Sequence, residues 1–205
     1  MVQVKKKSIK QKILSVAREQ ITVSGYETMS MRKIAAACNV SVGNLYNYFP
    51  NKEAILDAIV GDFYHTVMNL EQANIAMPSS LSPTGFEQYL TTFKNDLTEF
   101  INKNSDILRI LLVNVKGSKY ENFKKDFIAN FYDFELKSLA LLVSKNSLIN
   151  LPSETLIKNI CHMYLNLCET YLVEKKSTQW IDEMIDELNT FILRGLNIMI
   201  LESCN

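Results

Sequence analysis

Glycine and proline are scarce in this chain of 205 residues, which has 6 Gly and 4 Pro. Since these residues form most of the tight turns that connect β-strands, their scarcity argues against a β-rich protein. What is present favours a substantial core, because 47% of the residues are apolar. We therefore expect an all-α fold.

The chain also lacks a long apolar run. The longest, ILRILLVNV at residues 107–115, is interrupted by Arg109 and Asn114 and is too short to cross a bilayer. The first twelve residues, MVQVKKKSIKQK, lack the apolar stretch of a signal peptide. We expect a cytoplasmic protein that does not associate with membranes.

Cysteine and histidine are few, with 4 Cys and 2 His, and no CxxC pair occurs, so we expect buried free thiols. Cys161 and His162 are adjacent, and one helix cannot point both side chains at one metal ion. A site with ligands from several helices remains the alternative to an ordinary half-buried histidine. The acidic segment WIDEMIDEL, residues 180–188, is typical of a solvated helix face. We expect no catalytic residues, no metal site, no cofactor and no enzymatic activity.

The formal charge of the chain is zero, but it is unevenly distributed. Residues 1–60 contain nine Lys and Arg against four Asp and Glu, which gives this segment +5 and leaves −5 for the remainder. A basic end indicates a polyanionic partner. Chance clustering of charge on a solvated face is the alternative explanation.

Helix-start and helix-stop signals divide the basic segment into helices. Ser8 and Gln11 have the spacing of a helix start, and Gly25 is placed to end that helix in a left-handed cap. A second helix is expected over about 30–37, with Ser30 as its N-cap.

The next signals predict a tight turn and two further helices. Asn39 is one of the few residues besides glycine that tolerate the left-handed conformation of such a turn. Ser41 can cap a third helix over 42–48. Asn51, after Pro50, can cap a fourth helix that runs from residue 52 to about 75.

Two short helices joined by a three-residue turn form a helix-turn-helix, whose second helix lies in the DNA major groove. The spacing of four apolar residues predicts a small core between the N-terminal helices: Ile34, Ala35, Val40 and Leu45. The stretch SVGNLYNYFP, residues 41–50, then directs small, amide and aromatic side chains outward, with Phe49 expected in the core. Such a mixture suits base edges, thymine methyl groups and phosphates.

The remaining chain shows helical spacing with four interruptions. MPSSLSPTG at residues 77–85 is the clearest linker, and breaks are expected at 116–118, 144–153 and 175–178. About five more helices follow, which makes about nine in all.

The segment GYETMSMRKIAAACNVSVGNLYNYFPNKEAIL, residues 25–56, resembles the DNA-binding signature of the TetR/AcrR family of bacterial transcriptional repressors. Gly-Tyr, Ile-Ala, Val-Ser-x-Gly-x-Leu-Tyr-x-Tyr-Phe and Lys52-Glu53 carry the resemblance, which covers about a quarter of the chain. Asn39 stands where the family usually has glycine. Asn44 stands where Thr or Ala is common, which affects the expected base preference rather than the fold.

The resemblance implies a homodimer that binds a palindromic operator in double-stranded DNA and releases it when a small-molecule effector enters the C-terminal domain. Residues 1–50 would form the helix-turn-helix domain, and residues 51–205 the effector-binding and dimerisation domain. Effector entry would shift the fourth helix and change the separation of the two helix-turn-helix domains in the dimer.

Twelve residues are candidates for DNA binding. Thr28 and Ser30 are placed to hold a phosphate, and Lys52 to contact one. Arg32 can read guanine, with a phosphate contact or an ion pair as alternatives. The full set is Lys6, Thr28, Ser30, Arg32, Ser41, Val42, Gly43, Asn44, Tyr46, Asn47, Tyr48 and Lys52.

Explanations that do not involve DNA remain open for several of these residues. Gly43 permits a close approach to DNA or is an ordinary glycine at a helix start. Tyr46 and Tyr48 can donate to phosphates, although Tyr48 can instead serve packing. The basic run around Lys6 follows DNA as a disordered arm or is merely a solvated tail.

The C-terminal part carries two further predictions. Aromatic stripes at helical spacing are most often core, but some residues are expected to line an effector site: Tyr89, Phe93, Phe127, Phe131, His162 and Met163. No buried charge is evident in the sequence, so we expect an apolar or neutral effector. Broad apolar stripes on the last two helices predict a four-helix dimer interface: Tyr164, Cys168, Tyr171, Met184, Leu188, Ile192, Gly195 and Met199.

Two rival functions remain. A helical small-molecule carrier or enzyme could keep the N-terminal module only for packing, and it would show tight ligand binding or turnover without salt-dependent DNA affinity. The second rival keeps DNA binding but activates transcription, or organises DNA without any effector. Only the position of the operator relative to the promoter and the response to an effector would separate it from a repressor.

Overall fold

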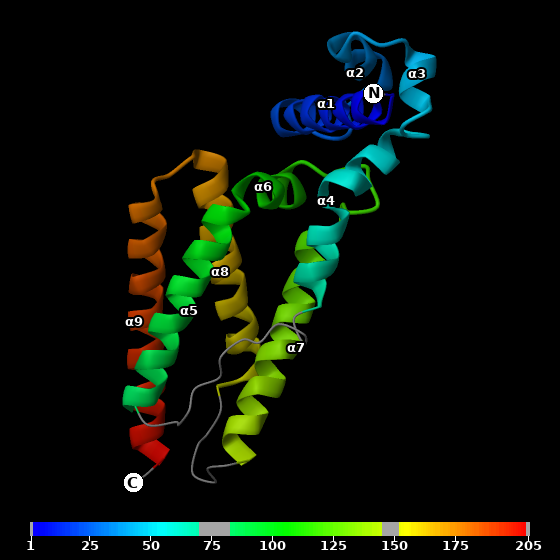
Figure 1. Cartoon of the computed structure of the whole chain (residues 1–205). Helices are drawn as coiled ribbons and strands as arrows, with labels where there is room; N and C mark the ends of the chain where they lie inside the picture. The colour runs from blue at the N-terminus through cyan, green and yellow to red at the C-terminus, as the bar shows by residue number, and fades with distance from the viewer. Residues whose placement is uncertain (1, 70–82, 145–151, 204–205) are drawn as a thin grey trace. The chain divides into compact units, whose positions relative to one another are not determined.

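The computed structural model describes residues 2–69, 83–144 and 152–203 (Figure 1). Every regular element in these residues is an α-helix, which confirms the all-α prediction. The helices of the described residues are α1 Val2–Ser24, α2 Met31–Cys38, α3 Val42–Tyr46, α4 Lys52–Met68, α5 Pro83–Lys103, α6 Ser105–Val113, α7 Phe123–Ser144, α8 Glu154–Glu174 and α9 Thr178–Ser203. Among the helices described, none is both long and apolar enough for a membrane span.

The chain forms two compact units. The first consists of Met1–Met68 and Asp106–Lys124, and the second of Asn69–Ser105 and Lys125–Asn205. Helices α1 to α4 and nearly all of α6 therefore belong to the first unit. The second contains α5, α8, α9 and nearly all of α7.

Helix α1 presents one apolar stripe to the core of the first unit. Ile13, Ala17 and Ile21 recur every four residues and are fully buried. Gly25 ends the helix at φ 79°, the left-handed conformation that the sequence predicts. The predicted start at Ser8 is wrong, because α1 already begins at Val2. The basic run around Lys6 is accordingly helical and is not a disordered arm.

Helices α2 and α3 close the predicted small core. Ile34, Ala35 and Leu45 have at most 1% of their surface exposed, and Phe49 is buried at 4%. Val40 is only half-buried. A fully buried side chain of this size contributes about 1.5–3 kcal/mol of transfer free energy, so this cluster holds two very short helices in place.

Helices α4 and α6 complete the first unit. Asn51 accepts a hydrogen bond from the N–H of Ala54 at 2.8 Å, which confirms its predicted role as the cap of α4. Ile55 and Leu56 of α4 and Ile110 of α6 are fully buried. Helix α4 is described as ending at Met68, several residues before the predicted end.

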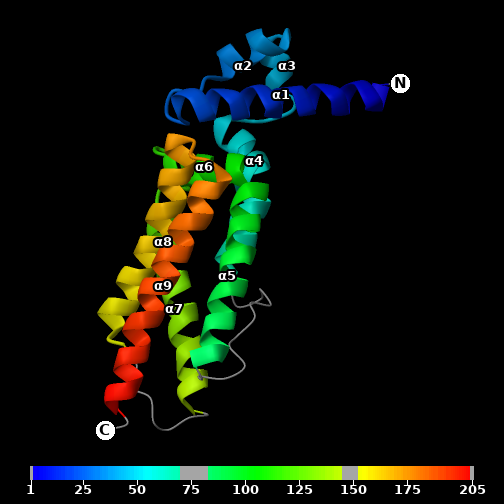
Figure 2. The same cartoon turned by 90° about the vertical axis from the view of Figure 1, so that its left-hand side faces the viewer.

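The second unit is a helical bundle in which α5, α8 and α9 run side by side (Figures 1 and 2). Ile181 and Ile185 of α9 are fully buried. The hydroxyl of Thr98 donates to Asp182 at 2.9 Å, so the acidic segment of α9 is only partly a solvated face. The Tyr164 hydroxyl donates to Oδ1 of Asn189, which ties α8 to α9.

Two of the predicted breaks are confirmed. Residues 116–118 lie between α6 and α7, and residues 175–177 separate α8 from α9, with Lys175 at φ 52°. The predicted linker at 77–85 extends too far, because α5 begins at Pro83, a residue well suited to the first helical position. Residues 77–82 and 145–151 lie outside the described residues.

Candidate nucleic-acid interface

The turn between α2 and α3 is built from two capping residues. Asn39 adopts φ 57° and ψ 45°, and its N–H donates to the carbonyl of Ala36 at 3.0 Å. Ser41 is the N-cap of α3, and its hydroxyl oxygen accepts from the N–H of Asn44 at 3.1 Å. The side chain of Ser30 caps nothing, although this residue precedes α2. The result is a helix-turn-helix with a turn of three residues.

The face of α3 that does not contact the core carries the predicted reading residues. Tyr46 is 50% exposed, and Gly43, Asn47 and Ser41 are exposed as well. Half-buried positions around them are Val42, Asn44 and Tyr48. Leu45 on the opposite side is fully buried. This face combines an aromatic ring, amides and a position without a side chain, as contact with base edges and phosphates requires.

Arg32 of α2 is exposed. In the part of the chain that the structure describes, no hydrogen bond or ion pair holds its guanidinium. Its donors can therefore reach the O6 and N7 atoms of guanine or a phosphate.

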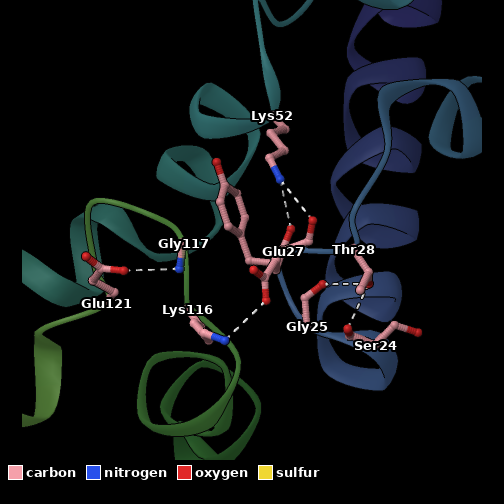
Figure 3. A network of polar contacts seen from close by, with 9 residues as sticks. Ser24, Gly25, Glu27, Thr28, Lys52, Lys116, Gly117 and Glu121 are labelled. Carbon is pink, nitrogen blue, oxygen red and sulfur yellow. Dashed lines mark hydrogen bonds and ion pairs between the residues drawn. The ribbon is translucent and has the colours of Figure 1, made fainter.

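Lys52 and Thr28 are already engaged within the protein (Figure 3). The ammonium of Lys52 donates to the carbonyls of Tyr26 at 3.2 Å and Glu27 at 3.3 Å, and it lies 4.3 Å from the centre of the Tyr26 ring. The Thr28 hydroxyl donates to the Ser24 carbonyl at 2.7 Å. A hydroxyl has one proton to donate, so a phosphate contact by Thr28 would use its backbone N–H unless the hydroxyl reorients.

The segment after α6 fastens the chain that leads into α2. The side-chain amide of Asn114 donates to the carbonyl of Ile21 at 2.9 Å, and the backbone carbonyl of Asn114 accepts the N–H of Tyr26 at 2.8 Å. Lys116 forms an ion pair with Glu27 at 3.6 Å (Figure 3). Sequence reasoning treated Asn114 only as an interruption of an apolar run.

Glu53 and Asp57, one turn apart on α4, continue this polar network. Glu53 accepts from the Tyr26 hydroxyl and from the N–H of Lys119, the latter at 3.1 Å. Asp57 accepts from the Tyr120 hydroxyl and pairs with the Lys119 ammonium at 2.6 Å. The hydrogen bonds from Lys119 and then Tyr120 hold the pKa of Asp57 below its usual value. The spacing of the two acids was the only sign of this network in the sequence.

Lysines of α1 lie beside the helix-turn-helix. The ammonium of Lys12 donates to the carbonyl of Cys38 at the end of α2 at 3.2 Å. Lys10 lies 5.5 Å from the centre of the Phe49 ring. Lys6 is exposed on the first turns of α1. Two lysines of the basic segment thus contact the helix-turn-helix directly.

The family model described as "Bacterial regulatory proteins, tetR family" matches residues 13–59, which contain α2, the turn, α3 and the start of α4. An uncharacterized HTH-type transcriptional regulator of Haemophilus influenzae is 25% identical over 166 residues, which are 73% of this chain and 84% of that protein. These matches support a TetR-family transcriptional regulator.

The chain is most similar to its relatives in the helix-turn-helix region. The HTH-type transcriptional regulator UidR of Escherichia coli K12 is 41% identical over 49 residues, but these are only 24% of this chain and 25% of UidR.

Solved structures show the same fold over nearly the whole chain. NalD, the secondary repressor of the MexAB-OprM multidrug efflux pump in Pseudomonas aeruginosa, aligns with a TM-score of 0.59 at 16% identity, over 94% of this chain and 97% of NalD. A regulator from Aquifex aeolicus aligns with a TM-score of 0.58 at 18% identity, over 90% and 99%. At such identities the likeness concerns the fold alone.

In the second unit of the regulator, most of the predicted effector-binding residues gather in two ring clusters. The rings of Tyr89 and Phe93 on α5 are 6.3 Å apart, and Phe93 meets the ring of Tyr164 on α8 at 5.2 Å. Phe127 and Phe131 on α7 stack with their centres 6.0 Å apart. All except Tyr164 are half-buried.

Two other predicted effector-binding residues lie elsewhere. His162 and Met163 are exposed on α8 in the single chain. The described residues contain no group of three or more His, Cys, Asp or Glu side chains that could hold a metal ion.

Glu135 on α7 is the residue of this unit that sequence reasoning missed. It is half-buried, and loss of hydration raises its pKa from 4.5 to about 7. Burial and then Glu135 raise the pKa of the Tyr89 hydroxyl and of the Cys161 thiol, the latter to about 12. The carboxyl group therefore lies within electrostatic range of residues from α5 and α8.

The predicted dimer residues are divided between the interior and the surface of the chain. Four are buried within one chain, namely Tyr164, Cys168, Leu188 and Ile192. Tyr171 and Met184 are half-buried, and Gly195 is exposed. The side chain of Met199 lies outside the described residues.

Exposed apolar side chains of α8 and α9 were not among those predictions, except for Met163, which had been assigned to the effector. Phe191 is 70% exposed, Leu156 44% and Met163 43%. On a helical wheel Leu156 shares a stripe with Met163, and Phe191 shares one with Met184 and Gly195.

Proposed function

We propose that this TetR-family regulator represses transcription by binding a palindromic operator as a homodimer, with α3 of each protomer in the DNA major groove. The observation that carries the proposal is the outward face of α3, with half-exposed Tyr46, exposed Gly43 and exposed Asn47, beside the unengaged Arg32. NalD, which has the same fold, is described as a repressor.

In this proposal residues 1–50 read DNA, and residues 51–205 bind the effector and form the dimer. Arg32 reads guanine, and Tyr46 donates to a phosphate or contacts a thymine methyl group. Lys52 acts on DNA indirectly, because its ammonium holds the carbonyls of Tyr26 and Glu27. The protein would act in the cytoplasm, where its operator is located.

The dimer would form through the outer faces of α8 and α9. Phe191, Leu156 and Met163 expose apolar surface there that a second copy can bury. A two-fold axis would pair the two helices of each protomer into a four-helix bundle. For both helix-turn-helix domains to reach one face of DNA, the α3 helices must lie about 34–36 Å apart, or a multiple of that distance.

The effector would bind in the second unit, among the rings of Tyr89, Phe93, Phe127 and Phe131. Effector binding would change the separation of the two helix-turn-helix domains in the dimer. Because each domain must meet its own groove, a shift of a few ångströms, on the order of a tenth of this spacing, would weaken binding strongly.

Selection of bound duplexes from a random pool, followed by affinity measurements at several salt concentrations, tests this function. We expect a palindrome, with affinity that falls steeply as salt rises. Arg32→Ala and Tyr46→Ala should each weaken binding by about 1–3 kcal/mol, whereas Lys158→Ala, an exposed cation on α8, should bind as the wild type does. Folded wild-type protein without sequence preference or salt dependence would contradict the proposal.

A further inference from the structure

Glu135 shares a face of α7 with the stacked rings of Phe127 and Phe131. The three residues are four positions apart, so they follow one another along one side of the helix. The two rings stack nearly parallel, at an interplanar angle of 7°. A half-buried carboxyl group thus continues the aromatic surface of α7.

Two other helices bring groups within range of this carboxyl. Tyr89 of α5 and Tyr164 of α8 are linked through the ring of Phe93, which lies 6.3 Å from the first and 5.2 Å from the second. Burial is the main reason that the pKa values of Tyr89, Tyr164 and Cys161 are raised, and the charge of Glu135 contributes in each case. The groups within electrostatic range of Glu135 thus include two tyrosine hydroxyls and a neutral thiol.

No hydrogen bond or ion pair joins Glu135 to any other residue that the structure describes. An anion withdrawn from water without a compensating partner destabilises the folded chain, which is why loss of hydration raises the pKa of this carboxyl to about 7. A cation from outside the chain would offset this loss of hydration by pairing with the carboxylate.

We propose that the effector of this regulator is a lipophilic organic cation, whose charged group binds the Glu135 carboxylate while its apolar body lies against the rings of α5 and α7. Such a ligand matches both halves of the site, because aromatic faces attract ammonium groups as well as apolar surface. A hard metal cation fits less well, since it requires several oxygen ligands. The inference rests on the proposed function and replaces the apolar or neutral effector that the sequence favours.

The test compares two probes of nearly equal shape and opposite charge, tetraphenylphosphonium and tetraphenylborate. Calorimetric titrations at pH 8, where Glu135 is mostly ionised, use the full-length wild type, Glu135→Gln and a control, Glu99→Gln, whose carboxylate is exposed on α5. The affinity of each protein for the selected duplex is measured with and without the phosphonium.

We expect the wild type and Glu99→Gln to bind the phosphonium at least about tenfold more tightly than the borate, and to lose DNA affinity in its presence. Glu135→Gln should lose about tenfold or more of its phosphonium affinity, keep its affinity for the borate and still bind the duplex.

Unchanged phosphonium affinity in Glu135→Gln would overturn the inference, as would a wild type that binds neither probe or prefers the borate. If the duplex is still bound in those cases, the proposed DNA-binding function stands. Failure of the wild type to bind any selected duplex counts against the proposed function instead, while the phosphonium titration still decides the role of Glu135.

Discussion

At Gly43, the chain itself does not require a glycine. A Cβ atom added there would meet no atom within 4 Å, and the residue has no positive φ. Gly25, by contrast, has φ 79°, which an L-residue rarely adopts. A position on the exposed face of α3 without a side chain is therefore explained best by what approaches from outside.

Gly43→Ala should separate DNA binding from stability. Because alanine favours helices, the unfolding free energy should stay constant or rise by up to about 1 kcal/mol. Affinity for the selected duplex should fall about tenfold or more, since the added methyl group meets the DNA backbone. Denaturant unfolding and fluorescence anisotropy measure the two effects. Equal DNA affinity in variant and wild type would show that Gly43 is an ordinary helix-start residue.

Glu135 should make stability depend on pH. Its pKa in the folded chain is raised from 4.5 to about 7, so the folded state binds the proton more tightly than the unfolded state. The resulting stability is fully present below about pH 4.5 and is lost as pH rises through about 7. For each unit by which folding raises the pKa, ionisation of Glu135 lowers the free energy of unfolding by at most about 1.4 kcal/mol. The effect is smaller where water still reaches this half-buried side chain.

In Glu135→Gln this pH dependence should disappear, and the variant should be more stable than the wild type at pH 8. The raised pKa values of Tyr89, Tyr164 and Cys161 keep these neighbours neutral across the window. Urea unfolding at pH 4.5, 6 and 8 measures the difference between the two proteins. A difference that stays constant with pH would contradict the assignment.

Local residue signals were predictable, whereas contacts over long distances were not. Asn39, Ser41 and Asn51 act within four residues of their own positions, so their caps can be read from sequence. Lys52 meets Tyr26 only because α4 packs beside α1, and the charge of Glu135 acts on the pKa of Tyr89, a residue 46 positions away. Nothing in the pattern around Glu135 distinguishes it from a solvated acid.

At the scale of elements, the accuracy with which the sequence predicts a helix end depends on how strongly the residues there disfavour a longer helix. The end of α2 is sharp, because Asn39 adopts the left-handed conformation. The beginning of α1 is not marked in this way: no proline or glycine precedes Ser8, and the helix continues back to Val2. Pro83 starts α5 rather than belonging to the linker, since proline is compatible with the first turn.

The left-handed conformation of Asn39 should make the stability of the helix-turn-helix sensitive to substitution at this position. Asn39→Ala should lower the unfolding free energy by about 1–2 kcal/mol, because a Cβ without a local polar group disfavours the left-handed conformation. Asn39→Gly is the matched variant and should be at least as stable as the wild type. Thermal unfolding followed by circular dichroism measures both. Equal stability of the alanine and glycine variants would mean that the turn can adopt another conformation.

At the scale of the whole molecule, the apolar faces of α8 and α9 explain why the dimer prediction was only partly specific. A stripe read from sequence does not distinguish the side that packs inside the chain from the side that meets a partner. The structure assigns Leu188 and Ile192 to the interior of one chain and leaves Phe191 70% exposed.

Phe191→Asp should convert the dimer into monomers, because a charge in an apolar interface is costly to desolvate. Val173→Asp is the control, since Val173 is exposed on α8 but lies about a quarter turn away from the stripe of Leu156 and Met163. Sedimentation equilibrium of both variants measures the mass. Dimers that persist in Phe191→Asp at low micromolar concentration would place the interface elsewhere.

The central claim is that two copies of α3 read the major groove of one symmetric operator. The most direct measurement is protection of guanine N7 from methylation by dimethyl sulfate on the selected duplex. We expect two symmetric groups of protected guanines, centred about 10–10.5 base pairs apart or a multiple of that, with protection lost in Arg32→Ala. A bound duplex whose guanines react as freely as in naked DNA, or are protected on one side only, would contradict it.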